Sequence, residues 1–389
     1  MAFLLIFIAV ISLISKMIPI NKPWLGEEEK QEVLDILAEN ALTSPANVGG
    51  KRVQEFENVL QSYLNVRHVV AVNSGTSALH ASLLSIDVKK GDEVILPSFT
   101  FVTTANSVVA AGAKPVFADV NGQDHTIDIA DVKKKINDNT KAIIPVHLYG
   151  HPSNMGEINA VAREHSLCVI EDACQSLGST YFQKQTGTFG DIGCFSFYAS
   201  KVITTGEGGA VVTNNDNFAE KLKMIRNHGM VHGYDTALFG LNLRLPELSA
   251  GIGKIQMRKL DKMLQMRRNN AEILFDGLKK LDQMQSVVNL PTETVDKKFN
   301  WYLFTVSFNS EKLREIVKDR LISEGIGATV YYDPPVHKTP YYKNLQSFSK
   351  DDTLPNTDWA CRHALSLPVH PLVTENDLRK ILNVFETLM

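Results

Sequence analysis

The sequence has little cysteine and little net charge. Four cysteines occur in 389 residues, Cys168, Cys174, Cys194 and Cys361, and none is part of a CxxC pair. All four lie in apolar runs, so we expect reduced, buried thiols in a reducing compartment. Lys and Arg total 40 against 43 Asp and Glu, a formal net charge of -3, which leaves no overall positive field for a nucleic-acid backbone. These features argue against a small disulfide-stabilised scaffold and against a nucleic-acid-binding protein.

The sequence also lacks the common nucleotide-binding motifs and a well-spaced set of metal ligands. No GxxxxGK[ST] phosphate loop occurs, and the segment GIGKIQ lacks the third glycine of a dinucleotide fingerprint. His147 with His151, and His228 with His232, have the i,i+4 spacing of helical zinc ligands. Each pair spans a glycine, however, and Pro152 follows the first pair. We therefore expect no metal site.

One long apolar run stands apart from this composition. Residues 1–15 are uncharged and approach the length of a short membrane span. A secretory signal begins with basic residues, whereas here the first charge, Lys16, follows the apolar run. Two explanations remain for residues 1–16: an upstream start codon assigned in error, with a native start near Met17, or an N-terminal anchor. We expect a cytoplasmic protein without membrane attachment.

Residues 46–250 show the pattern of a large α/β domain. Seven short, nearly continuous apolar runs alternate with amphipathic helical segments, which is typical of a mostly parallel sheet with helices on both faces. We therefore predict a seven-stranded sheet in a three-layer domain. The runs are 68–72, 93–97, 115–120, 142–147, 167–171, 193–198 and 209–213.

The flanking segments predict further helices and a smaller domain. Three glutamates at 27–29 lie where the first turn of a helix favours negative charge, so segment 17–45 should contain a surface helix. Apolar spacing over 252–281 indicates one long helix or a broken pair. Residues 251–389 are expected to form an α+β domain, with strands at 302–308 and 327–332 and helices at 312–324 and from 375.

Lys201 is the first candidate for a chemical role. It is nearly isolated among apolar and small residues in SFYASKVITTGEGG. An exposed lysine has a pKa of about 10.4, so a catalytic amine needs desolvation or neighbouring positive charge. The flanking glycines allow close approach to a planar ligand, and the threonines offer hydroxyls to a phosphate. The alternative is a lysine that caps a buried turn.

Asp172 ends the run LCVIED, at the carboxyl end of a predicted strand, where open α/β sheets bind ligands. Pyridoxal phosphate acts as an electron sink only while its ring nitrogen is protonated, and a buried aspartate beside that nitrogen supplies the opposite charge. Asp172 fits this role. The alternative is a carboxylate that caps the next helix or pairs with an arginine.

Two other strand ends suggest ligand contacts. In NSGTSALH, Gly75 and small hydroxyl residues precede a helix, and amides at a helix N-terminus can cradle a phosphate. In PSFTFVTTANSV, Phe99 and Phe101 are placed to stack on a flat ring, with core packing as the alternative.

Together and in this order, these motifs resemble the DegT/StrS family of pyridoxal-phosphate sugar aminotransferases, a branch of the fold-type I aminotransferases. The resemblance runs from about residue 18 to the C-terminus and also includes IPINKPWLG, PVFADV, PVHLYG, EDACQSLG, RNHG, GLNLRLPELSAGIGKIQ and LSLPVHP. The first sixteen residues have no counterpart, which favours the misassigned start.

The resemblance implies a role for each candidate residue. Lys201 would bind the cofactor covalently and transfer the proton, and Asp172 would pair with the pyridine nitrogen. Gln175 would hydrogen-bond the phenolic oxygen of the ring, and Phe101 would lie against the ring face.

The same resemblance implies a shared phosphate site. Gly75, Thr76 and Ser196 would contact the phosphate of the cofactor. Asn242, in GLNLRL, would reach it from the neighbouring subunit, so the protein would be a homodimer with shared active sites.

The function expected from this resemblance is transfer of an amino group, with glutamate as donor, to a nucleotide-linked keto-sugar in amino-sugar biosynthesis. The alternatives are amination of a free keto-cyclitol or keto-sugar, and a cofactor-binding regulator with little turnover. Val202 stands where the family often has a polar residue, and HGYDTALF matches no pattern that we can assign to a sugar. Family members that became dehydratases replace the lysine by histidine, so Lys201 argues against that activity.

Overall fold

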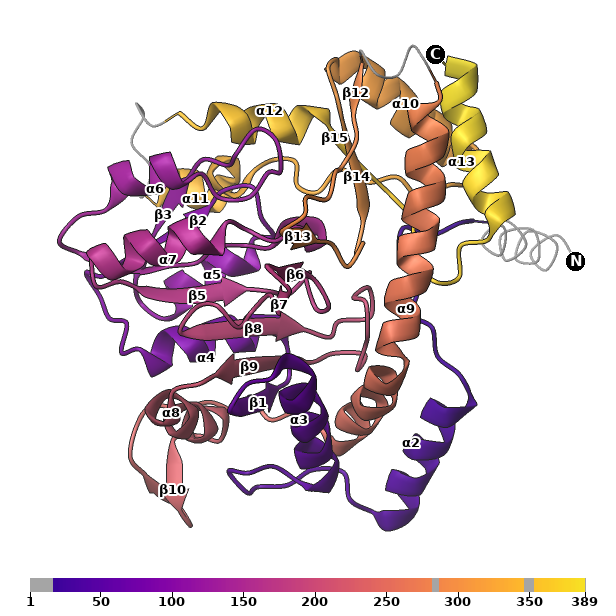
Figure 1. The fold of residues 1–389 in the computed structure, drawn as a ribbon. Helices are drawn as coiled ribbons and strands as arrows, with labels where there is room; N and C mark the ends of the chain where they lie inside the picture. The colour runs from indigo at the N-terminus through magenta and orange to yellow at the C-terminus, as the bar shows by residue number, and fades with distance from the viewer. Residues whose placement is uncertain (1–16, 282–286, 346–352, 389) are drawn as a thin grey trace, which may run out of the picture.

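The computed structural model describes residues 17–281, 287–345 and 353–388 (Figure 1). The apolar segment 1–16, for which we expected either a misassigned start or an anchor, lies outside the described residues. Among the helices that are described, none combines the length and the apolarity needed to cross a membrane.

A seven-stranded sheet forms the centre of the large domain, in the order β1-β9-β8-β5-β4-β2-β3. Strand β9 is antiparallel to both of its neighbours, whereas the other pairs are parallel. All seven predicted runs form these strands, so the predicted mostly parallel sheet is confirmed. The strands are β1 His68–Val72, β2 Glu93–Pro97, β3 Lys114–Ala118, β4 Thr140–Ile143, β5 Cys168–Asp172, β8 Ile192–Ser196 and β9 Gly209–Thr213.

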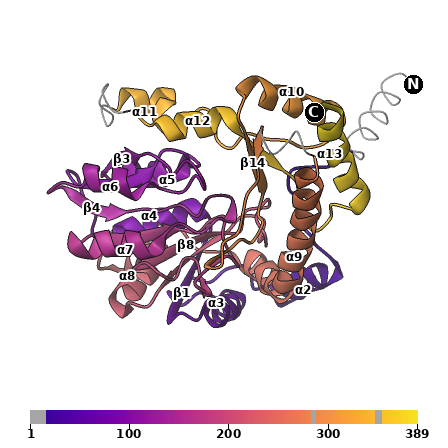
Figure 2. The same cartoon turned by 45° about the horizontal axis from the view of Figure 1, so that its top comes forward.

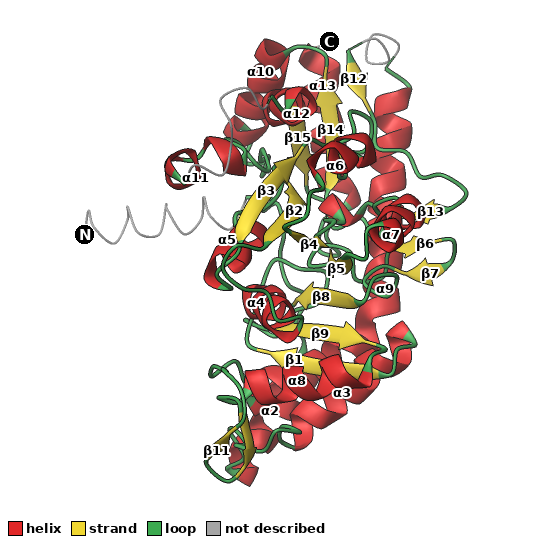
Figure 3. Cartoon of the chain, turned by 90° about the vertical axis from the view of Figure 1, so that its left-hand side faces the viewer, coloured by secondary structure: helices red, strands yellow, loops and turns green. Residues whose placement is uncertain are grey.

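Helices cover both faces of this sheet, as Figure 3 shows. Successive side chains of a strand point to opposite faces, so Val94 and Leu96 of β2 pack in one apolar cluster and Ile95 packs in another. The sheet is therefore buried on both sides, as the continuous apolar runs predicted. One face carries α4 Gly75–Ser85, α5 Thr103–Ala110 and α8 Asp216–Arg226, and the other carries α6 Ile129–Lys135 and α7 Met155–Glu164.

A single long helix, α9 Glu247–Lys279, settles the choice between one helix and a broken pair. It packs against α2 Glu27–Glu39, which begins with the three predicted glutamates, and against α3 Lys51–Leu64. Figure 2 shows α9 alongside both the large domain and the C-terminal elements. The boundary that we predicted between residues 250 and 251 lies inside this helix.

The C-terminal part contains an antiparallel sheet of β12 Val288–Asn289, β14 Phe304–Phe308 and β15 Ala364–Leu367. It packs with α10 Glu311–Ser323 and, through the apolar cluster that contains Phe308 and Phe385, with α13 Glu375–Leu388. The prediction of a strand at 327–332 is wrong. This segment contributes one isolated bridge, Thr329 to Ser366, because the chain turns directly afterwards. Smaller elements are β6 Thr180–Tyr181, β7 Lys184–Gln185, β10 Met230–His232, β11 Asp235–Thr236, β13 Lys297–Lys298, α11 Pro340–Asn344 and α12 Pro355–His363.

Candidate active site

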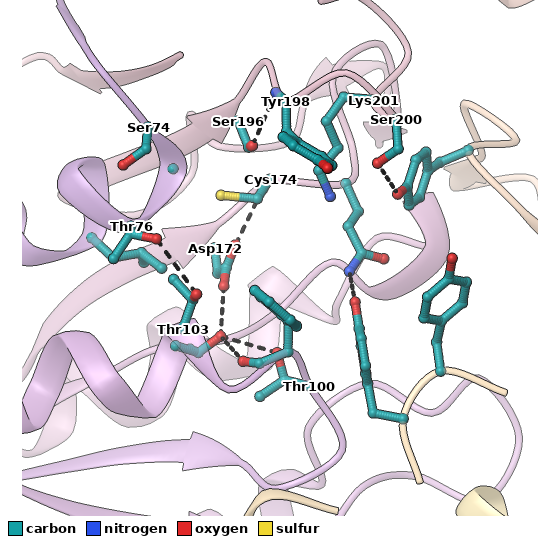
Figure 4. Close-up of a pocket in the computed structure, with 18 of the residues that line it drawn as sticks. Ser74, Thr76, Thr100, Thr103, Asp172, Cys174, Ser196, Tyr198, Ser200 and Lys201 are labelled. Carbon is teal, nitrogen blue, oxygen red and sulfur yellow. Dashed lines mark hydrogen bonds between the residues drawn. The ribbon is translucent and has the colours of Figure 1, made fainter. Parts of the chain in front are cut away.

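A cavity of about 500 Å³ lies at the carboxyl ends of β1, β2, β5 and β8. Because these strands point in the same direction, their ends meet at one edge of the sheet, and the predicted residues that follow them come together (Figure 4). All of the predicted site residues except Asn242 line the cavity. They are Gly75, Thr76, Phe101, Asp172, Gln175, Ser196 and Lys201.

The N-terminus of α4 forms one end of the cavity. The first amides of a helix have no acceptor within the helix, and Ser74 caps this one by accepting a 3.1 Å hydrogen bond from the amide of Ser77. A Cβ atom on Gly75 would lie 2.8 Å from Cβ of Ser196 and 3.0 Å from Sγ of Cys174. Glycine is therefore required here, and the free amides with the nearby hydroxyls make a site for an anionic group.

Asp172 is fixed at the floor of the cavity and is almost fully buried. Its Oδ2 accepts a 2.9 Å hydrogen bond from the hydroxyl of Thr104, and its Oδ1 accepts a 3.2 Å bond from the amide of Cys174. In the described part of the chain it pairs with no arginine, and turns rather than a helix follow it. Neither alternative role fits, and the carboxylate is left available to a cationic group in the cavity.

Lys201 lies in the turn after β8, and Figure 4 shows its amine directed into the cavity. Its Nζ is 4.7 Å from the centre of the Tyr302 ring. Among the described residues the amine has no hydrogen-bond or ion-pair partner, so it does not cap the turn. Val202, the position at which this chain departs from the family pattern, is buried in the core.

Gln175 and Phe101 line the side of the cavity. The Gln175 Oε1 accepts a 2.7 Å hydrogen bond from the amide of Tyr149, and its Nε2 donates a 3.1 Å bond to the hydroxyl of Tyr332. Phe101 is 53% exposed, whereas Phe99 is completely buried. The two phenylalanines are thus different: Phe101 faces the cavity and Phe99 belongs to the core.

Three tyrosines of the C-terminal part complete the wall, and the sequence analysis missed them. Tyr302, Tyr331 and Tyr332 line the same cavity as Lys201. They come from segments far along the chain from the other site residues, and the only sequence signal was the aromatic content of FNWYLF and TVYYDPP. Burial raises the pKa of the Tyr332 hydroxyl well above its usual value, so the group stays protonated and can donate a hydrogen bond.

Asn242 is exposed and lies outside the cavity of its own chain. It forms an isolated bridge with Asn227, and its carbonyl accepts a 3.3 Å hydrogen bond from the side-chain amide of Asn73. Its role across a subunit interface stays a prediction.

The first histidine pair with metal-ligand spacing, His147 and His151, does not act as a pair. His147 Nε2 lies 2.9 Å from Oε2 of Glu171, and its Nδ1 accepts a 3.0 Å bond from the amide of Ser153. His151 is stacked on Phe299 instead, with ring centres 4.0 Å apart. Within the described ranges no group of three or more potential ligands could hold a metal ion.

The sequence matches the DegT/DnrJ/EryC1/StrS aminotransferase family over residues 23–386. The chain belongs to this family. A GDP-perosamine synthase of Caulobacter vibrioides is 34% identical over 377 residues, which cover 96% of this chain and 98% of the relative. The fold matches Helicobacter pylori PseC, an aminotransferase involved in the biosynthesis of pseudoaminic acid, with a TM-score of 0.88, 30% identity and coverage of 96% and 99%.

A second solved structure bears on the cofactor. The putative sugar aminotransferase Spr1654 from Streptococcus pneumoniae, in its PLP form, matches with a TM-score of 0.88 and 25% identity, over 96% of this chain and 98% of that one. This DegT/DnrJ/EryC1/StrS protein is therefore a transaminase that depends on pyridoxal phosphate, in a family of sugar aminotransferases with the fold-type I architecture. The predicted family, fold, enzyme class and cofactor are confirmed.

The residues of this aminotransferase fit that cofactor. The anion site at Gly75 matches a phosphate, and Asp172 lines the same cavity with both oxygens accepting hydrogen bonds. Lys201 supplies an amine to this cavity, and Phe101, which is half-exposed, supplies an aromatic ring. A planar phosphorylated pyridinium needs this combination of groups.

Proposed function

We propose that the protein transfers an amino group from glutamate to a nucleotide-linked keto-sugar, as a cytoplasmic homodimer with shared active sites. The observation that supports this most is a single cavity that joins Lys201 and Asp172 to a wall of three tyrosines. Aromatic rings with polar tips suit a ligand that has both apolar faces and hydroxyl groups, as a sugar does. The similarity to a GDP-perosamine synthase supports a nucleotide-linked acceptor.

Different residues would hold the phosphate, the ring face and the phenolic oxygen of the cofactor. Gly75, Thr76 and Ser196 would bind its phosphate, and Phe101 would lie against the ring face. Gln175 would donate its Nε2 hydrogen to the phenolic oxygen, and when bound the ring supplies an electron sink for the bond-breaking step. Asn242 of a second copy would add a contact to the phosphate.

Asp172 keeps that electron sink active. Its carboxylate is held by Thr104 and by the amide of Cys174, which fix its direction. A negative charge beside the pyridine nitrogen stabilises the protonated form of the ring. Burial raises the pKa of the Cys174 thiol well above its usual range, so the thiol stays neutral and adds no negative charge beside the phosphate site.

Lys201 moves the proton. After the amine of glutamate displaces Lys201, the Nζ of Lys201 would remove the proton from the Cα atom of glutamate. It would then return this proton to the carbon on the other side of the transferred nitrogen. The keto-sugar then follows the same steps in reverse, so one base serves both half-reactions. The Tyr302 ring lies 4.7 Å from Nζ and would limit the positions that the amine can take during the transfer.

The cytoplasmic setting is supported by the thiols. The four cysteines are free in the structure, as expected for a reducing compartment.

The test is sustained turnover. The purified protein, loaded with pyridoxal phosphate, is incubated with glutamate and a panel of nucleotide-linked 4-keto-sugars and 3-keto-sugars together with a free keto-cyclitol, and 2-oxoglutarate is measured. We expect continuous formation of 2-oxoglutarate with one of these sugars and a single turnover without sugar. A single turnover with every sugar would support a cofactor-binding regulator instead. Sustained turnover only with the free keto-cyclitol would show that the acceptor is a free keto-cyclitol and not a nucleotide-linked sugar.

A further inference from the structure

The tyrosine of the PVHLYG motif has no role in the function described so far. Tyr149 lies in the short 3-10 helix Leu148–Gly150, is completely buried and has a φ of 59°. A large side chain rarely adopts this left-handed backbone conformation. It persists where the surrounding contacts require it, and such residues concentrate near functional sites.

Two hydrogen bonds connect Tyr149 to residues that line the cavity. Its amide donates a 2.7 Å bond to Oε1 of Gln175, and its hydroxyl donates to the carbonyl of Tyr331. Because Oε1 of Gln175 is occupied in this way, the Nε2 group of the same amide is turned toward the hydroxyl of Tyr332, 3.1 Å away. The contacts form a closed ring through Tyr149, Gln175, Tyr332 and Tyr331.

The tyrosine segment is also held from its far side. The thiol of Cys361 on α12 donates to the carbonyl of Tyr332 at 3.0 Å. Tyr332 in turn lies against Phe101, with ring centres 5.7 Å apart. The wall formed by Tyr331 and Tyr332 therefore has a defined position relative to the ring-binding residues, and Tyr149 joins Gln175 and Phe101 in linking it to the large domain.

We propose that Tyr149 is a positioning residue for the sugar acceptor, which acts by fixing Tyr331 and Tyr332 at the cavity wall. This rests on the proposed function. The reacting carbon of either substrate would have to lie beside Lys201, but the rest of a nucleotide-linked sugar is larger than glutamate and would extend to the tyrosine wall. Displacement of that wall should therefore impair use of the sugar more than use of glutamate.

The test variant is Tyr149→Phe, which removes the hydroxyl but keeps the ring and the amide that binds Gln175. We expect KM for the keto-sugar to rise about tenfold with kcat within about twofold, since one hydrogen bond to the wall is lost. The half-reaction with glutamate, followed by the visible absorbance of the bound cofactor, should stay within about twofold.

A matched control separates positioning from general stability. Tyr181→Phe also removes a hydroxyl from a buried tyrosine, one that donates a 2.9 Å bond to Oδ1 of Asn154 away from the cavity. Both variants should lower the unfolding midpoint of the cofactor-free protein to a similar extent. Only Tyr149→Phe should weaken binding of the nucleotide-linked amino-sugar product to the cofactor-free protein, measured by titration calorimetry.

A double-mutant cycle then tests the route of the effect. If Tyr149 acts through Tyr332, the variant with both Tyr149→Phe and Tyr332→Phe should have the KM of Tyr332→Phe alone. Additive effects, or equal slowing of the glutamate and sugar half-reactions, would overturn the proposal. A wild-type protein that aminates no sugar would refute the proposed function, whereas sugar turnover with an unaffected Tyr149→Phe variant would refute this inference alone.

Discussion

The hydroxyl of Thr104, in the first turn of α5, donates a 2.9 Å hydrogen bond to the carboxylate of Asp172 at the end of β5. The contact joins two strand-end segments across the floor of the cavity. This bond gives the Oδ2 atom of Asp172 a hydrogen-bond donor from the protein, but the donor carries no positive charge. The charge partner of Asp172 must therefore come from a ligand, and the pyridinium of the cofactor provides one.

Replacing Asp172 by asparagine should abolish this charge while keeping the shape of the side chain. We expect cofactor binding to persist and kcat to fall by about 100-fold or more, on the order of 2.7 kcal/mol, because the ring nitrogen loses its stabilising charge. Steady-state kinetics checks this. Asp119→Asn is the matched control, since Asp119 is also buried but accepts bonds from the amides of Asn356 and Thr357. Activity of Asp172→Asn within about tenfold of wild type would make Asp172 a structural residue.

Lys201→Ala should lose covalent attachment of the cofactor and all transamination, because this amine has no substitute in the described cavity lining. Borohydride reduction followed by peptide mass spectrometry should find the cofactor on Lys201 in the wild-type protein and nowhere in the variant. Lys184→Ala serves as the control, because Lys184 lies over the Phe189 ring on a separate hairpin. Retained turnover in Lys201→Ala would refute the assignment.

Gly75→Ala tests the anion site. The added methyl group would lie 2.8 Å from Cβ of Ser196, so the start of α4 must shift. We expect the affinity for pyridoxal phosphate to fall by about tenfold or more while the fold is retained. At Gly122 the nearest atom to an added methyl is 3.5 Å away, so Gly122→Ala should bind the cofactor normally. Equal affinities in fluorescence titrations of the two variants would argue against the phosphate site.

Asn242 can be tested by complementation, since it lies outside the cavity of its own chain. If it serves the site of a second copy, mixing inactive Lys201→Ala with impaired Asn242→Ala should restore activity. One site of each mixed dimer would then contain both native residues, so the expected recovery is roughly a quarter of wild-type activity at equal mixing. Absence of recovery, under conditions shown to exchange subunits, would indicate self-contained sites.

The buried His151 should make the protein less stable in acid. Burial lowers its pKa to about 4, whereas in an unfolded chain histidine binds the proton at about pH 6.5. The unfolded state therefore binds more protons between these values, and stability falls as the pH decreases from 6.5 toward 4. The free energy of unfolding, measured in urea, should fall between pH 7 and pH 5, and this fall should be smaller by about 1–2 kcal/mol in His151→Gln. Between pH 7 and 8 the wild type and the variant should show the same pH dependence, and an unchanged acid slope would contradict the assignment.

Local patterns in the sequence determined the sheet and most of the site. The seven apolar runs became strands because a strand buried on both faces needs nearly continuous apolar residues, which can be recognised without knowing its neighbours. Gly75 and Asp172 could be predicted as neighbours because parallel strands place their carboxyl ends at one edge, whereas Ser196 was named only through the resemblance to a known family. The resemblance to a known family then implied a role for each of them.

The tertiary structure alone decided which distant segments close the cavity. Tyr332 lies 157 residues from its partner Gln175, and Tyr331 lies 182 residues from Tyr149. Such contacts depend on how the C-terminal part packs against the large domain, and this packing cannot be predicted from the local spacing of apolar residues. The same reason explains the wrong strand at 327–332. An apolar run becomes a strand only where a partner lies beside it over several residues, and here the chain turns from Tyr331 onward, so only Thr329 bridges to Ser366 of β15.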